Sequence, residues 1–545
     1  MQYFDYIFAV IASISVVFAS LNLVHMLQLE SYQGKMYLKW VIKHIKAEFL
    51  PYISIGLASI LFRIGWVLFD TQIQAVALIC RVLADILYVL MLFAVYFAYK
   101  KRQAKKPLVI TGRIKRLIVA LFIVSFLFSI NFFMPYSYTS GGGINWSRFI
   151  LSDIVRYTPG TLLSLTVFLA YLITYPIESA VKKWYYNDAK KILKSRTDLK
   201  KIAITGSYGK TSTKFALGTL LSEKFDVLFT PGSVNTPMGV TRIVRENLKA
   251  ENNVFIAEMG ARYKGDIKEL CDLVAPDIGI ITSVGKQHLE TFGSIEGVIA
   301  TKSELMYGLC EDGICFFNGD YEYCRHMYED CTLREKYLFG TEGDNLYMRA
   351  ENITVSGEGS TFTLVANDGK SIRCTTDLLG RPSIWNILSA ASCAYRLGMT
   401  LEEIAVGISK MESVEHRLQL IKGPVTVIDD AFNSNPIGSK EALKVLKAFP
   451  GKRIIITPGM VELGSEEEQL NYEFGQAMAD STDVAILVGK SHIEPIYNGL
   501  IDKGFSKQNI IKVASLNEAM AILPNHTEPG CVVLFENDLT DNYEE

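Results

Sequence analysis

The chain has 545 residues, a formal net charge of −2 and 49% hydrophobic residues. This length allows about three or four domains. The near-neutral charge gives no sign of the basic surface on which nucleic-acid binding depends, so nucleic acid is not an expected partner. The hydrophobic residues are concentrated in the first third of the sequence, which predicts a membrane-anchored protein with a soluble remainder.

Five apolar segments near the amino terminus approach the ~20 residues needed to cross a bilayer. They are residues 6–27, 50–68, 73–98, 117–134 and 158–177. No basic region precedes the first segment, so we do not expect a cleaved signal peptide. Lysine and arginine are dense in the loops after the first, third and fifth segments and sparse in the other loops. This bias predicts a multi-pass protein of the cell membrane whose amino terminus lies outside and whose residues after the fifth segment lie in the cytoplasm.

Two charged residues lie inside the third segment. Arg81 and Asp85 are four residues apart, on one face of a helix, where they can neutralise each other. Two interpretations stay open, a structural pair within a helix bundle and part of a site for a lipid headgroup.

The pattern changes from Lys201 onward, where short apolar runs alternate with amphipathic stretches of helical length. Runs such as NVFIAEMG, DIGIITSVG, GICFFNG, VTVIDDAFN, KRIIITPG and DVAILVGK end at glycine or polar turns, which is typical of parallel sheets covered by helices on both faces. The stretch ENITVSGEGSTFTLVANDG alternates around glycine-rich turns and predicts an antiparallel hairpin beside the sheet. The expected fold class is therefore a bundle of about five helices followed by α/β domains.

Nine cysteines are scattered along the chain without a C-x-x-C pair. The four that lie closest together in sequence, Cys310, Cys315, Cys324 and Cys331, have spacings that fit no zinc site, so we expect free thiols in a reducing cytosol.

The stretch KIAITGSYGKTSTK, residues 201–214, has the order strand, glycine-rich loop, Lys-Thr and helix that binds phosphate. It is not the common Walker loop, because that spacing would need its first glycine at Ile204. Gly206 and Gly209 allow backbone N–H groups to crowd a phosphate, and the following helix adds its positive end. Lys210 offers a charge to the β- and γ-phosphates, and Thr211 offers a hydroxyl to Mg²⁺.

This loop resembles the T-G-T-x-G-K-T loop of the Mur ligases, the ATP-dependent amide-forming enzymes of peptidoglycan synthesis. Further matches follow in the family's order: FIAEMGARYKGDI, ITSVGKQHLETFGSIEGVIATKSEL, VIDDAFNSNPIGSKEAL and GMVELG. They are similar to the MurF branch, which adds D-alanyl-D-alanine. The resemblance covers the chain from about residue 199. It implies a central ATP-binding domain at 199–412 and a Rossmann-like domain at 413–545, after a transmembrane helical region at 1–182 and a linker at 183–198. That region stands where the family has its UDP-binding domain.

The resemblance also implies which residues carry the chemistry. The nucleotide contacts are Gly206, Ser207, Gly209, Lys210, Thr211, Ser212, Asn386, Arg417 and Asp430. Two Mg²⁺ sites are expected, with Thr211, Glu258, His288 and Lys302 as ligands, and Lys302 matches a lysine that is carbamylated in the family. A carbamate supplies the oxygen ligands that Mg²⁺ prefers. The groups expected to act in catalysis are Lys210, Glu258, His288 and Lys302, and the substrate contacts are Asn235, Asn433 and Asn435.

Several of these assignments keep an alternative. His288 can be a buried core histidine, Lys302 an unmodified surface lysine, and Lys440 either a solvated helix lysine or a phosphate contact. Where the family reads G-x-H-N-x-x-N, this chain reads GRPSIWN. Asn386 is retained for adenine, but Arg381 and Pro382 replace His-Asn, which leaves the neighbouring contact open.

The reaction implied by the resemblance is formation of an amide from a carboxylate and an amine, with ATP converted to ADP and phosphate through an acyl phosphate. The expected partners are a muramyl peptide as the carboxylate donor, D-alanyl-D-alanine as the amine, and the lipid bilayer. Two alternatives remain, a membrane-tethered amino-acid ligase for another polymer of the poly-γ-glutamate type, and a non-catalytic transport or scaffold protein that uses ATP as a switch. A protein that uses ATP only as a switch would not need a second metal site, so the expected second Mg²⁺ site argues against the last alternative. The sequence leaves open whether the donor is linked to UDP or to a lipid.

Overall fold

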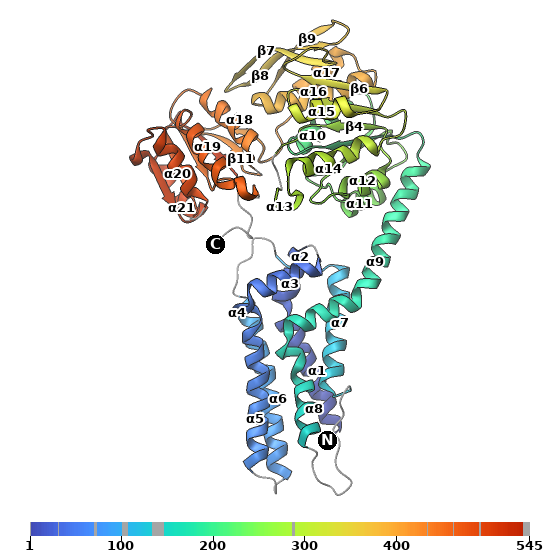
Figure 1. Ribbon diagram of the computed structural model, residues 1–545, viewed down its shortest axis with the longest axis vertical. Helices are drawn as coiled ribbons and strands as arrows, with labels where there is room; N and C mark the ends of the chain where they lie inside the picture. The colour runs from blue at the N-terminus through green and yellow to red at the C-terminus, as the bar shows by residue number, and fades with distance from the viewer. Residues whose placement is uncertain are drawn as a thin grey trace. The chain divides into compact units, whose positions relative to one another are not determined.

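The computed structural model divides the chain into two compact units, Met1–Lys183 and Trp184–Glu545 (Figure 1). The structure describes residues 2–30, 32–69, 74–100, 107–132, 146–285, 289–432, 434–461, 463–489 and 492–537. Each unit has its own hydrophobic core.

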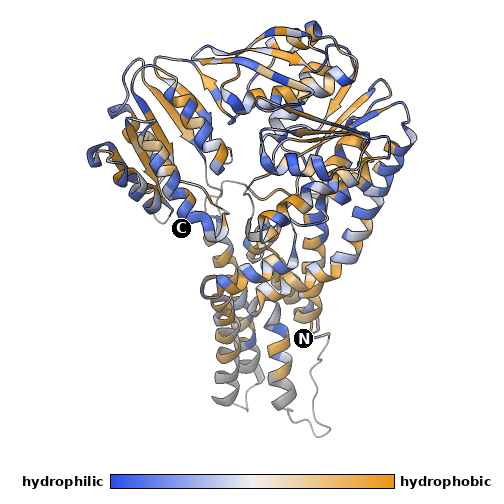
Figure 2. Ribbon diagram, turned by 45° about the horizontal axis from the view of Figure 1, so that its top comes forward, coloured by the Kyte–Doolittle hydropathy of each residue, from blue (hydrophilic) through white to orange (hydrophobic). Residues whose placement is uncertain are grey.

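The first unit is helical, and helices lie at all five places where the sequence predicts a membrane span. The helices are α1 (Gln2–Ala19), α2 (Leu21–Leu29), α3 (Gly34–Lys43), α4 (Ile45–Glu48), α5 (Leu50–Phe69), α6 (Gln74–Lys100), α7 (Gly112–Ser129), α8 (Trp146–Thr161) and α9 (Leu163–Ser195). Hydrophobic residues run along many of them (Figure 2). By length and composition, two stretches of the described chain could cross a membrane, Arg81–Lys100 and Leu163–Ser195, and α1 with α2 forms a third candidate bent by 42°.

The charged residues of α6 have other partners than the sequence predicts. Arg81 forms an ion pair with Asp5 of α1, and Asp85 pairs with Arg156 of α8 at 3.0 Å. Arg156, which is fully buried, also lies 3.1 Å from Asp5, and Tyr157 donates to Asp85 at 2.7 Å. The prediction that Arg81 and Asp85 neutralise each other is therefore replaced by a network across three helices, in which every buried charge has an opposite charge on another helix.

The segment expected as a linker, residues 183–198, is mostly helical, because α9 continues to Ser195. Its last turns carry Ala189 and Leu193, which are buried in the core of the second unit together with Leu199. Apolar residues at helical spacing explain why this stretch packs instead of remaining an extended connection.

The central part of the second unit is a nine-stranded sheet in the order β2-β3-β1-β4-β5-β6-β7-β8-β9. Its strands are β1 (Lys200–Thr205), β2 (Val227–Phe229), β3 (Val254–Glu258), β4 (Ile278–Ile281), β5 (Ile314–Asn318), β6 (Glu335–Gly340), β7 (Met348–Ser356), β8 (Gly359–Ala366) and β9 (Ser371–Thr376). The strands from β2 to β7 pair in parallel, and β7, β8 and β9 are antiparallel. The predicted hairpin is thus confirmed as β7 and β8, and it extends the sheet.

Helices cover both faces of this sheet. Successive residues of a strand point to opposite faces, so each strand contributes apolar side chains to both layers. Ile202 and Ile204 face a cluster formed with α10 (Lys210–Leu221), α16 (Gly380–Arg396) and α17 (Leu401–Ser409). Ala203 faces the other side, where the end of α9 packs with α11 (Pro237–Asn247), α12 (Asp266–Val274), α14 (Ile295–Tyr307) and α15 (Glu322–Asp330). The short helix α13 (Leu289–Phe292) precedes α14. The carboxyl ends of β1, β3 and β4 thus lie together at one edge, where α/β sheets bind ligands.

A second sheet of six strands follows in the order β10-β11-β15-β12-β13-β14. Its strands are β10 (Gln419–Ile421), β11 (Thr426–Asp430), β12 (Arg453–Thr457), β13 (Val484–Val488), β14 (Ile510–Val513) and β15 (Val532–Glu536), and all neighbours except β10 and β11 are parallel. Helices α18 (Pro436–Lys447), α19 (Glu467–Ala479) and α20 (Ile493–Asp502) pack on one face, and α21 (Leu516–Ile522) packs on the other. The apolar runs that predict parallel strands are all strands in the structure, and the eight cysteines whose side chains are described are free thiols.

Candidate active site

The phosphate loop lies between the end of β1 and the first turn of α10, and two of its positions require glycine. A Cβ on Gly206 would collide with Thr282 Oγ1 and would lie 3.0 Å from the backbone nitrogen of Ser283. Gly209 has φ +78°, and its Cβ would lie 2.5 Å from Asn386 Oδ1. The two glycines therefore allow the loop to pack closely against the end of β4 and against α16.

The loop is held by the residues that follow β4. The backbone nitrogens of Ser207 and Tyr208 donate to Ser283, to its carbonyl oxygen at 2.9 Å and to its hydroxyl at 2.8 Å. Ser207 Oγ donates to the carbonyl of Gly285 at 3.2 Å and accepts from that residue's nitrogen. The side chain of Ser207, which is expected at the nucleotide, thus bonds to the segment that follows β4. This anchoring makes the loop a preformed cradle.

Lys210 folds back over the loop. Its Nζ donates to the carbonyl oxygens of Gly206 at 2.8 Å and of Ser207 at 3.1 Å. The pKa of Lys210 is lowered to about 8, mainly by burial and to a smaller extent by the charge of Arg417, while Glu258 opposes the change. A phosphate oxygen bound in the loop would meet this ammonium and hold it in the charged form.

Arg417 connects the start of the C-terminal part to the loop. Its guanidinium donates to Thr211 Oγ1 at 3.3 Å and stacks over the Phe432 ring at 4.3 Å. Burial lowers the pKa of Arg417, and the carboxylates of Glu258 and Asp430 act in the opposite direction. These contacts bring together four residues that separate motifs predict: Thr211, Glu258, Arg417 and Asp430.

Glu258 ends β3 and is only 1% exposed. Its Oε1 accepts from Asn235 Nδ2 at 3.1 Å, and its Oε2 lies 3.1 Å from Lys214 Nζ. Asn235 was expected at the substrate, and here it holds the expected metal ligand. The sequence analysis missed Lys214. The available signal was its place four residues after Lys210, on the same face of a helix whose neighbouring positions are apolar.

Lys302 lies on α14 with 3% of its surface exposed. Its pKa is lowered to about 7, mainly by burial and to a smaller extent by the charge of Lys210. The interpretation of Lys302 as an exposed surface lysine is therefore wrong. His288 lies outside the described residues. Within the described ranges no three His, Cys, Asp or Glu side chains gather as a metal site. The buried carboxylate of Glu258 and the Thr211 hydroxyl nevertheless suit Mg²⁺, which protein sites commonly bind through one or two carboxylates together with substrate phosphates and water.

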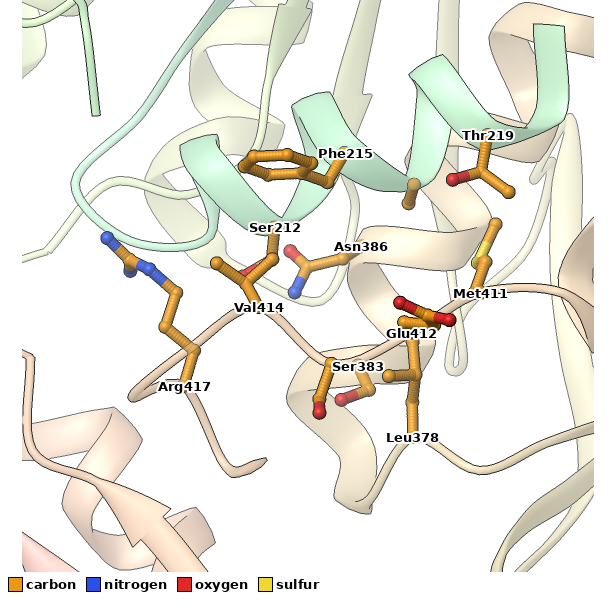
Figure 3. A pocket seen from close by; sticks show the side chains of 12 residues that line it. Ser212, Phe215, Thr219, Leu378, Ser383, Asn386, Met411, Glu412, Val414 and Arg417 are labelled. Carbon is orange, nitrogen blue, oxygen red and sulfur yellow. The ribbon is translucent and has the colours of Figure 1, made fainter. Parts of the chain in front are cut away.

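A pocket lies beside α10 (Figure 3). Its lining residues include Ser212, Phe215, Ser383, Asn386, Glu412 and Val414. Figure 3 shows Asn386 facing α10, and its Oδ1 accepts from Thr213 Oγ1 at 3.1 Å. Arg381 instead pairs with Glu342 at 3.1 Å and does not line the pocket. The contact that the sequence leaves open is therefore not assigned to Arg381, and Ser383 and Glu412 are polar residues that line the pocket.

Two carboxyls, the partly buried Asp430 and the buried Glu536, end neighbouring strands of the second sheet. Asp430 and Glu536 are register partners on β11 and β15, so their side chains share one face. Asp430 accepts from the Leu418 nitrogen at 3.1 Å, and Glu536 Oε1 accepts from Ser434 Oγ at 2.6 Å, while Glu536 Oε2 has no hydrogen-bond partner among the described residues. Burial raises the pKa of Asp430 to about 6 and that of Glu536 well above its usual range.

The remaining predicted residues have simple positions. Asn433 lies outside the described residues. Asn435 caps α18, because its Oδ1 accepts from the Gly438 nitrogen at 2.7 Å. Lys440 pairs with Glu473 at 3.3 Å on the surface, which favours a solvated helix lysine.

Comparison with known proteins gives consistent matches from residue 204 onward. The family model for the Mur ligase middle domain matches residues 204–394, and that for the Mur ligase glutamate ligase domain matches residues 416–536. The chain is 33% identical over 293 residues to the UDP-N-acetylmuramoyl-tripeptide–D-alanyl-D-alanine ligase of Escherichia coli (strain K12), covering 53% of this chain and 64% of that protein. Identity to the enzyme of the same name from Bacillus subtilis (strain 168) is 29%, over 62% of this chain and 72% of that one. The chain thus spans less than two thirds of the E. coli relative.

Solved structures agree with the sequence matches. A crystal structure of MurF from Acinetobacter baumannii has a TM-score of 0.60 and 26% identity, covering 66% of this chain and 77% of that chain. The MurF ligase from Thermotoga maritima in complex with ADP has a TM-score of 0.59 and 24% identity, covering 66% and 80%. The fold of the second unit is therefore that of the Mur ligase central and C-terminal domains.

Proposed function

This chain belongs to the Mur ligase family, and from that premise we propose that it is an ATP-dependent, ADP-forming ligase that joins D-alanyl-D-alanine to the carboxylate of a muramyl tripeptide in peptidoglycan synthesis. The names of the E. coli and B. subtilis relatives support this choice of substrates. The observation that carries the proposal is the convergence of Lys210, Thr211, Glu258 and Arg417 around a preformed phosphate loop.

The proposed reaction begins with transfer of the γ-phosphoryl group of ATP to the substrate carboxylate, which gives an acyl phosphate. The amine then attacks the acyl carbon, and phosphate leaves. Phosphoryl transfer depends mainly on positioning and on neutralising charge. Lys210 and Arg417 would stabilise the negative oxygens, and the N–H groups of the loop and α10 would orient the phosphates. Glu258 and Thr211 would hold Mg²⁺, which supplies charge neutralisation at the β- and γ-phosphates.

We also propose that Lys302 is carbamylated. A lysine reacts with CO₂ only as the neutral amine, and a pKa of about 7 leaves a large neutral fraction at physiological pH. Among the described residues no hydrogen bond engages its Nζ. As a carbamate, Lys302 would exchange an ammonium that repels Lys210 for a carboxylate that attracts it. It would thereby become a candidate ligand for a second Mg²⁺ together with His288.

The proposal for the first unit is that it anchors the ligase to the cell membrane with the catalytic part in the cytoplasm, beside ATP. The apolar helices and the lysine-rich loops support it. Cysteines introduced at Ser140 and Gln103, both outside the described residues, test the topology in intact cells. A membrane-impermeant thiol reagent should label position 140 and not position 103, and the reverse pattern would contradict the proposal.

The function is tested by incubating the purified full-length protein in detergent with ATP, Mg²⁺, UDP-muramyl-tripeptide and D-alanyl-D-alanine. ADP and the muramyl pentapeptide should appear in equal amounts. A parallel reaction with a lipid-linked tripeptide shows which donor is used, and one with glutamate as the amine tests the alternative of a poly-γ-glutamate type ligase. Absence of pentapeptide from both donors would refute the proposal.

A further inference from the structure

Lys214 is a buried cation that the proposed reaction does not use. It lies on α10, one helical turn after Lys210, and its side chain is 0% exposed. Its Nζ donates to the carbonyl of Gly232 and to Glu258 Oε2, the latter at 3.1 Å. An ammonium without water needs such partners, because an unpaired buried charge costs several kcal/mol.

Lys214 and Glu258 are both tied to the loop 230–236. Gly232 of this loop accepts from Lys214, and Asn235 of the same loop donates to Glu258 Oε1 at 3.1 Å. The loop is also anchored by its backbone, because the Gly260 nitrogen donates to the Asn235 carbonyl at 2.9 Å. Both oxygens of Glu258 are therefore engaged by protein groups, one by a cation and one by an amide.

The charges around Glu258 are predominantly positive. Lys214 lies against this carboxylate, and the charges of Lys210 and Arg417 also act on it, so three cations influence Glu258, while Asp430 is a second carboxylate beside Arg417. A divalent cation that approached Glu258 alone would meet net positive charge at close range, where the repulsion is poorly screened. The phosphates of a nucleotide would make the local charge negative and would therefore attract the divalent cation.

We propose that Lys214 is the resident counter-ion of Glu258, which prevents the carboxylate from taking up a free divalent cation and holds the loop 230–236 in place, so that the metal enters only together with nucleotide phosphates. This rests on the proposed function, since the role of Glu258 as a metal ligand belongs to it. Lys214 is thus a positioning residue. If Lys214 only stabilised the fold, its removal would weaken metal binding to the protein. If it is the counter-ion of Glu258, its removal should strengthen metal binding.

The experiment measures Mn²⁺ binding to the full-length protein without nucleotide, from the electron paramagnetic resonance signal of free Mn²⁺. The Lys214→Met variant should bind one Mn²⁺ per chain at least tenfold more tightly than the wild type. Lys214→Arg, which keeps the charge, should resemble the wild type. The double variant Lys214→Met/Glu258→Gln should lose the gain, which assigns the new site to Glu258. Lys249→Met, at an exposed lysine of the same unit, is the matched control.

Two results would overturn the inference. One is a Lys214→Met protein that binds Mn²⁺ with ADP, and is therefore folded, yet shows no gain without it. The other is a result for the wild type itself, namely tight binding of Mn²⁺ through Glu258 in the absence of nucleotide. Failure of the proposed function would be seen separately, as absence of pentapeptide in the ligation assay, and would leave the Mn²⁺ titrations readable.

Discussion

Replacing Glu536 with glutamine should stabilise the protein at alkaline pH, because it removes a buried charge that lies beside a second carboxyl. Burial raises the pKa of Asp430 from 3.8 to about 6 and that of Glu536 well above 4.5, and the charge of Asp430 raises the pKa of Glu536 further. A raised pKa means that the folded state holds the proton where the unfolded state has lost it. The stability that these two groups contribute should therefore be fully present below about pH 4 and should be lost as the pH rises through about 6.

The magnitude follows from the cost of ionising Glu536 in its buried position. One pKa unit corresponds to about 1.4 kcal/mol, and both burial and the charge of Asp430 raise the pKa of Glu536, so we expect a gain of about 1–2 kcal/mol at pH 8. The glutamine keeps the acceptor for Ser434 and adds an N–H that can donate to Asp430.

Thermal unfolding of the full-length protein, followed by intrinsic fluorescence at pH 5 and pH 8, measures the effect. The variant should unfold a few degrees higher at pH 8 and nearer to the wild type at pH 5. Glu528→Gln, at an exposed carboxylate of the same domain, should change neither value. Equal destabilisation of Glu536→Gln at both pH values would refute the reasoning, because it would mean that the carboxyl was contributing a hydrogen bond that glutamine cannot replace.

Three further predictions concern the nucleotide site. Lys210→Ala should reduce ADP release by ~10² or more in a coupled assay while leaving the protein folded, since the lost charge stabilises the transferring phosphoryl group; near-normal turnover would contradict the assignment. Lys302→Ala should be poorly active and partly rescued by a short carboxylic acid, and removal of CO₂ should inactivate the wild type, with reactivation by bicarbonate increasing as the pH rises through about 7; indifference to bicarbonate would exclude the carbamate. Asn386→Ala should raise the KM for ATP about fivefold to tenfold with little change in kcat, and an unchanged KM would remove Asn386 from the base pocket.

The central α/β fold could be predicted because its strands are buried on both faces. Runs such as IAIT at β1 and VFIAE at β3 are apolar throughout, and each is followed by a glycine or polar turn at the edge where the site forms. Gly206 and Gly209 could also be predicted from the sequence. The backbone comes close to neighbouring segments at these positions, and only glycine leaves room for that approach.

Contacts between distant segments could not be predicted in this way. Arg81 and Asp85 are adjacent on a helix and oppositely charged, yet their partners Asp5 and Arg156 come from other helices, and sequence spacing carries no information on which helices meet. Asn235 was predicted at a substrate and was found on Glu258, because its loop passes beside the end of β3. Similarly, sequence spacing leaves the role of Arg381 open, and in the structure Arg381 pairs with Glu342 from a distant segment.

Each cation of the site has an oxygen partner within the protein, which stabilises its charge when no nucleotide is bound. Lys210 is bound to the carbonyls of its own loop, Lys214 to Glu258 and Gly232, and Arg417 to Thr211. Each of these partners is an oxygen, and a phosphate or a metal-bound nucleotide would provide or rearrange the same kind of contact. Nucleotide binding would therefore exchange the hydrogen-bond partners of these cations and would also bring negative charge to a site whose charges are predominantly positive. Such an exchange lowers the affinity for any single anion, and it favours a ligand that can satisfy all three cations at once, as a nucleotide triphosphate with its metal does.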